Sequence, residues 1–169
     1  MATSLSARLG LNLAALIEDS LDVGIVSYPA NFGANYNFAD GTGANQAKKI
    51  WTDTRTLTAS ATENLDLAGG LTDAFGAALT FTAIKALIVK ADPANVNDVV
   101  LGGHASAAWV APFAASTERV NVKPGGMIAL VAPDATGYAV VATTGDLLKV
   151  LNSAGSTSVI YTIIIIGVV

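Results

Sequence analysis

Cysteine is absent from this chain of 169 residues, and histidine occurs once, as His104. Without cysteine, disulfides, thiolate catalysis and cysteine metal sites are all excluded. Zinc takes three or four Cys, His or carboxylate ligands, and a Ser-His-Asp arrangement needs a histidine base. His104 follows the glycine pair Gly102-Gly103, a context typical of a loop or edge residue. We therefore expect no catalytic residue, no cofactor and no metal, and we expect that the protein is not an enzyme.

Charge is also scarce. Charged residues make up 13% of the chain, against about 25% in average proteins. Disordered chains and coiled coils both need more charge than this. The nine basic side chains are scattered and the net charge is −4, so no basic patch for nucleic acid is visible and an anionic membrane is an unsuitable partner. A surface with so few charges suits a protein that packs against neighbouring subunits.

No hydrophobic run is long enough for a membrane-spanning helix. The most apolar stretch, Val159–Val169, has 11 residues, whereas such a helix needs about 20. Its β-branched residues predict a strand that is buried on both faces. The first 20 residues lack the basic run and long apolar core of a secretory signal.

Short strands separated by turns occupy the chain from Lys48 onward. Glycine and proline mark the turns, for example at Gly69-Gly70, Asp92-Pro93 and Pro124-Gly125-Gly126. Nothing of comparable helical character lies between them. We therefore predict an all-β fold with a β-sandwich over residues 46–169, either jelly-roll-like or immunoglobulin-like.

Residues 1–45 are predicted to form an N-terminal arm, consisting of a short helix and an extended segment. Leucine and isoleucine recur at spacings of three and four over residues 4–21, which is typical of one helix stripe. The extended segment carries aromatic residues and turn formers. We expect the arm to bind a partner, although the same helix would also suit packing on its own domain. The expected partner-binding residues are Leu9, Leu13, Leu16, Ile17, Phe32 and Tyr36.

Four other sets of residues are candidates for chemistry. Paired carboxylates could act as a glycosidase acid and base, but solvated surface is the more conservative interpretation. A cluster of oxygen ligands resembles a calcium loop without EF-hand spacing, and ordinary turn chemistry explains it. Two tryptophans suit glycan stacking or, more conservatively, the core. The glycine-rich segment 40–46 lacks the Gly-Lys-Ser/Thr ending of a phosphate loop. The carboxylates are Asp53, Glu63, Asp66 and Asp73; the calcium candidates are Asp92, Asn95, Asn97 and Asp98; the tryptophans are Trp51 and Trp109.

Several turn-and-strand segments resemble a family of small structural proteins of tailed bacteriophages. These segments lie at 41–47, 53–57, 61–69, 71–76, 123–126, 132–138 and 161–167. The resemblance implies a capsid decoration, or cement, protein that is a homo-oligomer and binds the major capsid protein and copies of itself. It implies a location on the virion surface, with assembly in the host cytoplasm and without nucleic-acid or membrane partners. A tail or head-spike component and a glycan-binding β-sandwich module are the alternatives.

Overall fold

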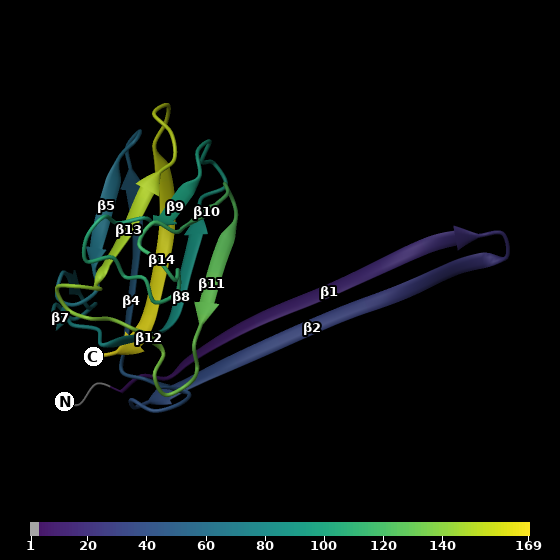
Figure 1. Cartoon of the computed structure of the whole chain (residues 1–169). Coiled ribbons are helices and arrows are strands. Elements are labelled where there is room, and N and C mark those ends of the chain that lie inside the picture. Colours follow the sequence, from purple (N-terminus) through teal and green to yellow (C-terminus); the bar gives the residue numbers. More distant parts are fainter. Residues whose placement is uncertain (1–3) are drawn as a thin grey trace.

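The computed structural model describes residues 4–169, which form a β-sandwich and a long two-stranded hairpin that projects from one end of it (Figure 1). Residues 4–169 contain no helix, so the all-β prediction is confirmed and the predicted N-terminal helix is wrong. A search of this part of the chain for a helix able to span a membrane accordingly found none.

Two antiparallel sheets build the sandwich. One has the strand order β10-β9-β13-β5. The other has the order β11-β8-β14-β4, and β12 pairs with β8 beside it. A separate small sheet pairs β6 with β7. The strands are β4 (Lys49–Leu57), β5 (Thr62–Asp66), β6 (Leu71–Thr72), β7 (Ala78–Leu79), β8 (Ala83–Ala91), β9 (Val99–Gly102), β10 (Arg119–Val122), β11 (Met127–Val131), β12 (Tyr138–Ala139), β13 (Leu147–Asn152) and β14 (Val159–Val168).

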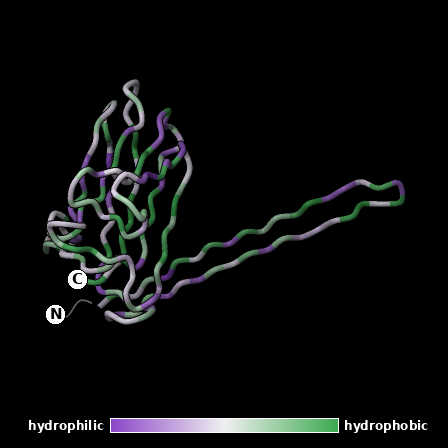
Figure 2. The backbone as a smooth tube through the Cα atoms, in the orientation of Figure 1, coloured by the Kyte–Doolittle hydropathy of each residue, from purple (hydrophilic) through white to green (hydrophobic). Residues whose placement is uncertain are grey.

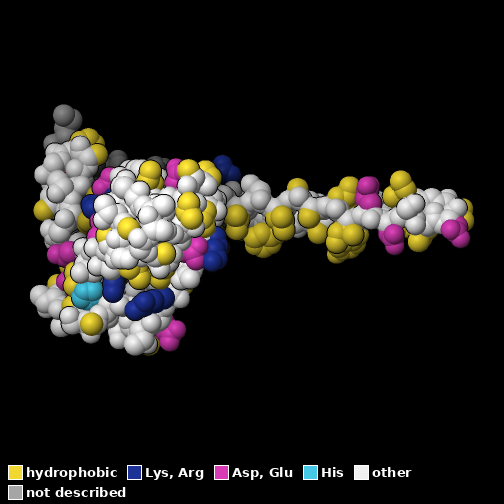
Figure 3. All heavy atoms as spheres, turned by 90° about the horizontal axis from the view of Figure 1, so that it is seen from above, with side chains coloured by type: hydrophobic (Ala, Val, Ile, Leu, Met, Phe, Trp, Pro, Cys, Tyr) yellow, Lys and Arg dark blue, Asp and Glu magenta, His cyan; other side chains and the backbone are white. Residues whose placement is uncertain are grey.

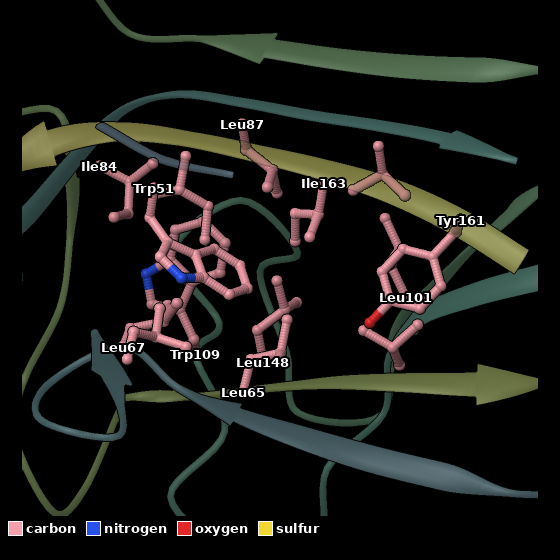
Figure 4. Close-up of a cluster of buried hydrophobic side chains, with 14 of the residues drawn as sticks. Trp51, Leu65, Leu67, Ile84, Leu87, Leu101, Trp109, Leu148, Tyr161 and Ile163 are labelled. Carbon is pink, nitrogen blue, oxygen red and sulfur yellow. The ribbon is translucent and has the colours of Figure 1, made fainter. Parts of the chain in front are cut away.

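The core fills the space between these two sheets (Figure 4). Successive residues of a strand point to opposite faces, and in β14 the residues Tyr161, Ile163 and Ile165 point inward and are buried. Trp109 also lies in this core. Its ring meets those of Phe113 and Tyr138 edge-on, and its Nε1 donates a hydrogen bond to a backbone carbonyl at 2.9 Å.

The hairpin consists of β1 (Ala7–Leu21) and β2 (Gly24–Asp40). The two strands pair antiparallel from Ala7↔Phe38 to Leu21↔Gly24, so the reversal needs only Asp22 and Val23. β1 has 15 residues, which corresponds to about 50 Å at roughly 3.3 Å per residue. The ribbon passes the lower end of β11 and continues away from the sandwich (Figure 1).

The base of the hairpin is tied to the sandwich by a short connecting segment. β3 (Gln46–Ala47) pairs parallel with the end of β2. Asp40 accepts hydrogen bonds from the backbone of Leu5 at 3.3 Å and from Nζ of Lys48 at 2.8 Å. The backbone N–H of Asn45 donates to the carbonyl of Pro133 at 2.7 Å. These contacts set the direction in which the hairpin leaves the sandwich.

Candidate functional site

The hairpin has one apolar face and one polar face. Directly opposite residues of an antiparallel pair point to the same face, so the register assigns each side chain. The apolar face carries Ala7, Leu9, Leu11, Leu13, Ala15, Ile17, Asp19 and Leu21 of β1, with Val26, Tyr28, Ala30, Phe32, Ala34, Tyr36 and Phe38 of β2. The other face carries Arg8, Gly10, Asn12, Ala14, Leu16, Glu18 and Ser20, with Ile25, Ser27, Pro29, Asn31, Gly33, Asn35 and Asn37.

Most of the apolar face is uncovered. Leu13 is 56% exposed, Ile17 68% and Tyr28 67%, and hydrophobic side chains follow the arm in Figure 3. An isolated two-stranded hairpin is at best marginally stable in water. Contiguous exposed apolar surface marks an interaction site in most soluble proteins. This face is therefore the candidate docking surface of the molecule.

Five of the six residues that the sequence suggested for partner binding share this face. They are Leu9, Leu13, Ile17, Phe32 and Tyr36. The sixth, Leu16, lies opposite Pro29 on the other face, where it is also exposed.

Leu11, Leu21 and Val26 belong to the apolar face but were not among the predicted partner-binding residues. The alternation Leu9, Leu11, Leu13 is the signal that could have revealed the first of them. An apolar residue at every second position is typical of a half-buried strand.

The base of the apolar face is already covered by the protein's own sandwich. Phe38 is buried and packs with Ala47, Ala86 and Ile166. Beyond this contact, an apolar groove of about 350 Å³ separates the hairpin from the sheet, and its lining includes Phe32 and Met127. The hairpin and the outer face of the sheet are therefore chemically compatible surfaces.

That outer face consists of rows of side chains that run across β4, β14, β8 and β11. The row nearest the hairpin base is Ile50–Ile166–Ala86–Val131. The next is Thr52–Ile164–Ile88–Ala129, followed by Thr54–Thr162–Lys90–Met127 and by Thr56–Ile160. The first row is partly buried under the hairpin, whereas the third and fourth are largely exposed. Hydroxyls of Thr54 and Thr162 are 3.0 Å apart.

Charges are unequally distributed along the hairpin. Glu18, Asp19 and Asp22 lie at its tip, while Arg8 and Lys48 lie at its base. The ammonium group of Lys48, and then the N–H of Leu5, hold the pKa of Asp40 below its ordinary value. Figure 3 shows the same separation, with acidic side chains at the far end of the arm and basic ones near the sandwich.

The four candidate carboxylates serve the fold. Arg55 bridges Asp53 at 3.2 Å and Glu63 at 2.8 Å, and Glu63 also accepts a hydrogen bond from the buried phenol of Tyr161. Desolvation, and then this carboxylate, raise the pKa of Tyr161.

The other two candidate carboxylates accept hydrogen bonds within turns. Asp66 accepts from the backbone N–H of Ala68 at 2.9 Å. Asp73 accepts from the backbone N–H of Ala77 at 2.9 Å and from Lys49 at 2.8 Å. Lys49, and then Ala77, lower the pKa of Asp73.

The calcium candidates do not converge on a common point. Asn97 donates a hydrogen bond to Asn152 at 3.0 Å, Asp98 pairs with Lys123 at 2.7 Å, and Asn95 bonds the backbone of Ile160. Residues 4–169 contain no group of three or more His, Asp or Glu side chains placed to hold a metal ion.

Trp51 and Trp109 are buried, 6% and 2% exposed, so neither is a stacking platform on the surface. His104 lies in a loop and is half-buried, and its Nδ1 contacts the backbone of Ser106. These positions agree with the conservative interpretations of all three residues.

Comparison with known proteins found no match, either among protein-family models or among curated proteins. The candidate site consists of the apolar face of the hairpin and the adjacent sheet face.

Proposed function

We propose that the protein is a virion structural protein, a capsid decoration or cement protein that binds the outside of a tailed-bacteriophage head. The observation that carries this proposal is the long amphipathic hairpin whose apolar face extends, uncovered, away from a β-sandwich. The resemblance of residues 41–167 to phage structural proteins supports the same role. The partners would be the major capsid protein and copies of this chain, without nucleic acid or membrane.

The topology of the sandwich supports a structural role. One sheet holds the first, third, sixth and eighth of the main strands, namely β4, β8, β11 and β14. The other holds β5, β9, β10 and β13. This is the two-Greek-key order of a jelly roll, an architecture of viral capsid domains and lectins. With Trp51 and Trp109 in the core, no exposed tryptophan favours the lectin alternative.

The mechanism would be passive. Each large apolar side chain that becomes fully buried contributes roughly 1.5–3 kcal/mol. Docking of a few residues such as Leu13, Ile17 and Phe32 would therefore bind one subunit to the next, and repetition over a shell would multiply the effect. The surface of the virion would be the site of action, after assembly in the host cytoplasm.

The test is co-sedimentation of the purified protein with undecorated, expanded capsids, followed by imaging. We expect saturating occupancy at symmetry-related positions. Ile17→Asp should abolish this binding, because it places a charge on the apolar face, whereas Leu16→Asp on the opposite face should preserve it. Absence of binding to heads, with binding to isolated tails instead, would assign the protein to the tail.

A further inference from the structure

The far part of the hairpin cannot be covered by its own sandwich. The ribbon passes the lower end of β11 and points away from both sheets (Figure 1). Its exposed part runs from Leu11 to Leu21, about 36 Å at roughly 3.3 Å per residue. Whatever covers this apolar surface therefore belongs to another molecule.

The outer face of β4, β14, β8 and β11, which is exposed beyond its first row, has compatible dimensions and chemistry. β4 and β8 have nine residues each, about 30 Å, and four strands span about 19 Å at roughly 4.8 Å per strand. The hairpin base already packs on the first row of this face through Phe38. A hairpin from a second copy would extend the same kind of contact over the exposed rows, as two sheets that pack face to face.

Each of the two surfaces carries one charged side chain, and the two charges have opposite signs. Among Ala7–Leu21 and their partners on β2, the apolar face of the hairpin carries one charged side chain, Asp19. Across the rows of the sheet face from Ile50 to Thr56, one side chain is charged, that of Lys90. A charge that is buried in an interface without a partner is unfavourable, so two surfaces with otherwise uncharged side chains and one opposite charge each have a preferred register.

We propose that the hairpin of one copy docks, apolar face down, on the outer face of β4, β14, β8 and β11 of a second copy, with Asp19 beside Lys90. The proposal rests on the proposed function in treating the hairpin as a docking arm, and it names a copy of this chain as its partner. Since the two surfaces differ, the contact is head-to-tail, and a closed ring would cover every hairpin.

The first experiment measures the mass of the full chain in solution, without capsids, by sedimentation and native mass spectrometry. We expect a concentration-dependent oligomer. Ile17→Asp should give a monomer, whereas Leu16→Asp, a neighbouring residue of similar exposure on the other face, should leave the oligomer intact. A monomeric wild type, or equal effects of the two substitutions, would overturn the proposal.

A charge swap tests the register. Asp19→Lys and Lys90→Asp should each weaken self-association about tenfold, because like charges then face each other. The double swap should restore it. Lys149→Asp, on the outer face of the other sheet, is the control and should have no effect. The pairing of Asp19 with Lys90 would be contradicted if neither single substitution weakened self-association, or if the double substitution did not restore it.

The absence of cysteine allows a direct trans measurement. An Asp19→Cys chain mixed with a Lys90→Cys chain of different tagged size should form a disulfide-linked heterodimer on oxidation. Leu16→Cys mixed with Lys90→Cys should not, and cross-linking of both pairs to the same extent would overturn the proposal. If the protein self-associates but does not bind phage heads, the proposed function fails and the contact between copies stands. If a monomer binds heads, the contact between copies fails and the proposed function stands.

Discussion

At the scale of single residues, polar side chains inside the sandwich bind its loops together. Asn152 is 1% exposed, and its Nδ2 donates to the carbonyls of Thr58 at 3.0 Å and Thr157 at 2.7 Å. Its Oδ1 accepts from Asn97 at 3.0 Å. The loops 58–61, 92–98 and 153–158 are thus held at one end of the sandwich by a pair of buried asparagines. This asparagine clamp, Asn97 with Asn152, includes one of the four residues that suggested calcium in the sequence, namely Asn97.

Asn152→Ala should destabilise the protein by about 2 kcal/mol, since it removes the buried hydrogen bonds that Asn152 makes with Thr58, Thr157 and Asn97. Chemical denaturation followed by tryptophan fluorescence measures the loss. Asn64→Ala, on the exposed side of β5, is the control and should change the free energy of unfolding by less than about 0.5 kcal/mol. Similar losses in both variants would contradict the role of the clamp.

The turn after β11 makes stability depend on pH. Hydrogen bonds from the hydroxyl of Thr136 and the N–H groups of Gly137 and Thr136 lower the pKa of Asp134 to about 2 from its ordinary 3.8. The unfolded chain therefore binds this proton more readily than the folded one. The stabilisation is complete above pH 4 and is lost as the pH falls towards 2.

NMR titration of the Asp134 carboxyl should accordingly give a midpoint near pH 2. In Asp134→Asn, the stability should decline less steeply between pH 4 and pH 2 than it does in the wild type. A midpoint near the ordinary 3.8 of aspartate would show that the turn does not select the ionised form.

At the scale of elements, the hairpin shows how a periodic sequence can be misread. Leu5, Leu9, Leu13, Ile17 and Leu21 are spaced by four, which is close to the helical period of 3.6 but also a multiple of the strand period of two. Leu11 lies on the same strand face as Leu9 and Leu13. In a helix, its side chain would point away from the face that Leu9 and Leu13 share. Pairing with β2 is what makes this segment a strand and not a helix. The partner residues on β2 are up to 31 positions away in the chain, as for Ala7 and Phe38.

The exposed part of the hairpin should be dispensable for the fold. Leu9 and Tyr36 pair directly, so Gly10–Asn35 can be replaced by Asn-Gly, which closes a two-residue turn and keeps the register. Phe38 and the base contact remain. We expect a melting temperature within about 3 °C of the wild type, equivalent to roughly 1 kcal/mol at this size. Loss of cooperative unfolding would place the hairpin within the core of the fold.

At the scale of the whole molecule, turn signals sufficed to predict a β-sandwich, because glycine and proline act locally. The order of strands within each sheet depends on contacts between distant segments, so the sequence left jelly-roll-like and immunoglobulin-like arrangements open. The dependence on contacts between distant segments also explains why the sequence predicted the candidate site only in part. Individual apolar residues of the arm were recognisable, but their common face depends on pairing, and the matching sheet face is assembled from four strands that are scattered along the chain.

Addition of the protein to undecorated capsids should raise the temperature at which the shells disrupt, since many weak contacts act together. The rise should saturate with occupancy and be measurable by light scattering. The Asn-Gly hairpin-shortened chain should produce none of it, although it folds. If the shortened chain raised the disruption temperature equally, the sandwich alone would be sufficient to stabilise the shell.

The backbone N–H of Leu5 donates to Asp40 at the base of the hairpin, and the C-terminus lies at the same end of the sandwich, whereas the loop between β13 and β14 lies at the opposite end (Figure 1 and, in the same orientation, Figure 2). Ser153–Ser158 of this loop are exposed. A peptide inserted at Gly155 would therefore stand at the end of the sandwich opposite the base of the arm. A fusion at the C-terminus would lie near the base of the arm, so this loop is the better position for displaying a foreign sequence on an assembled particle.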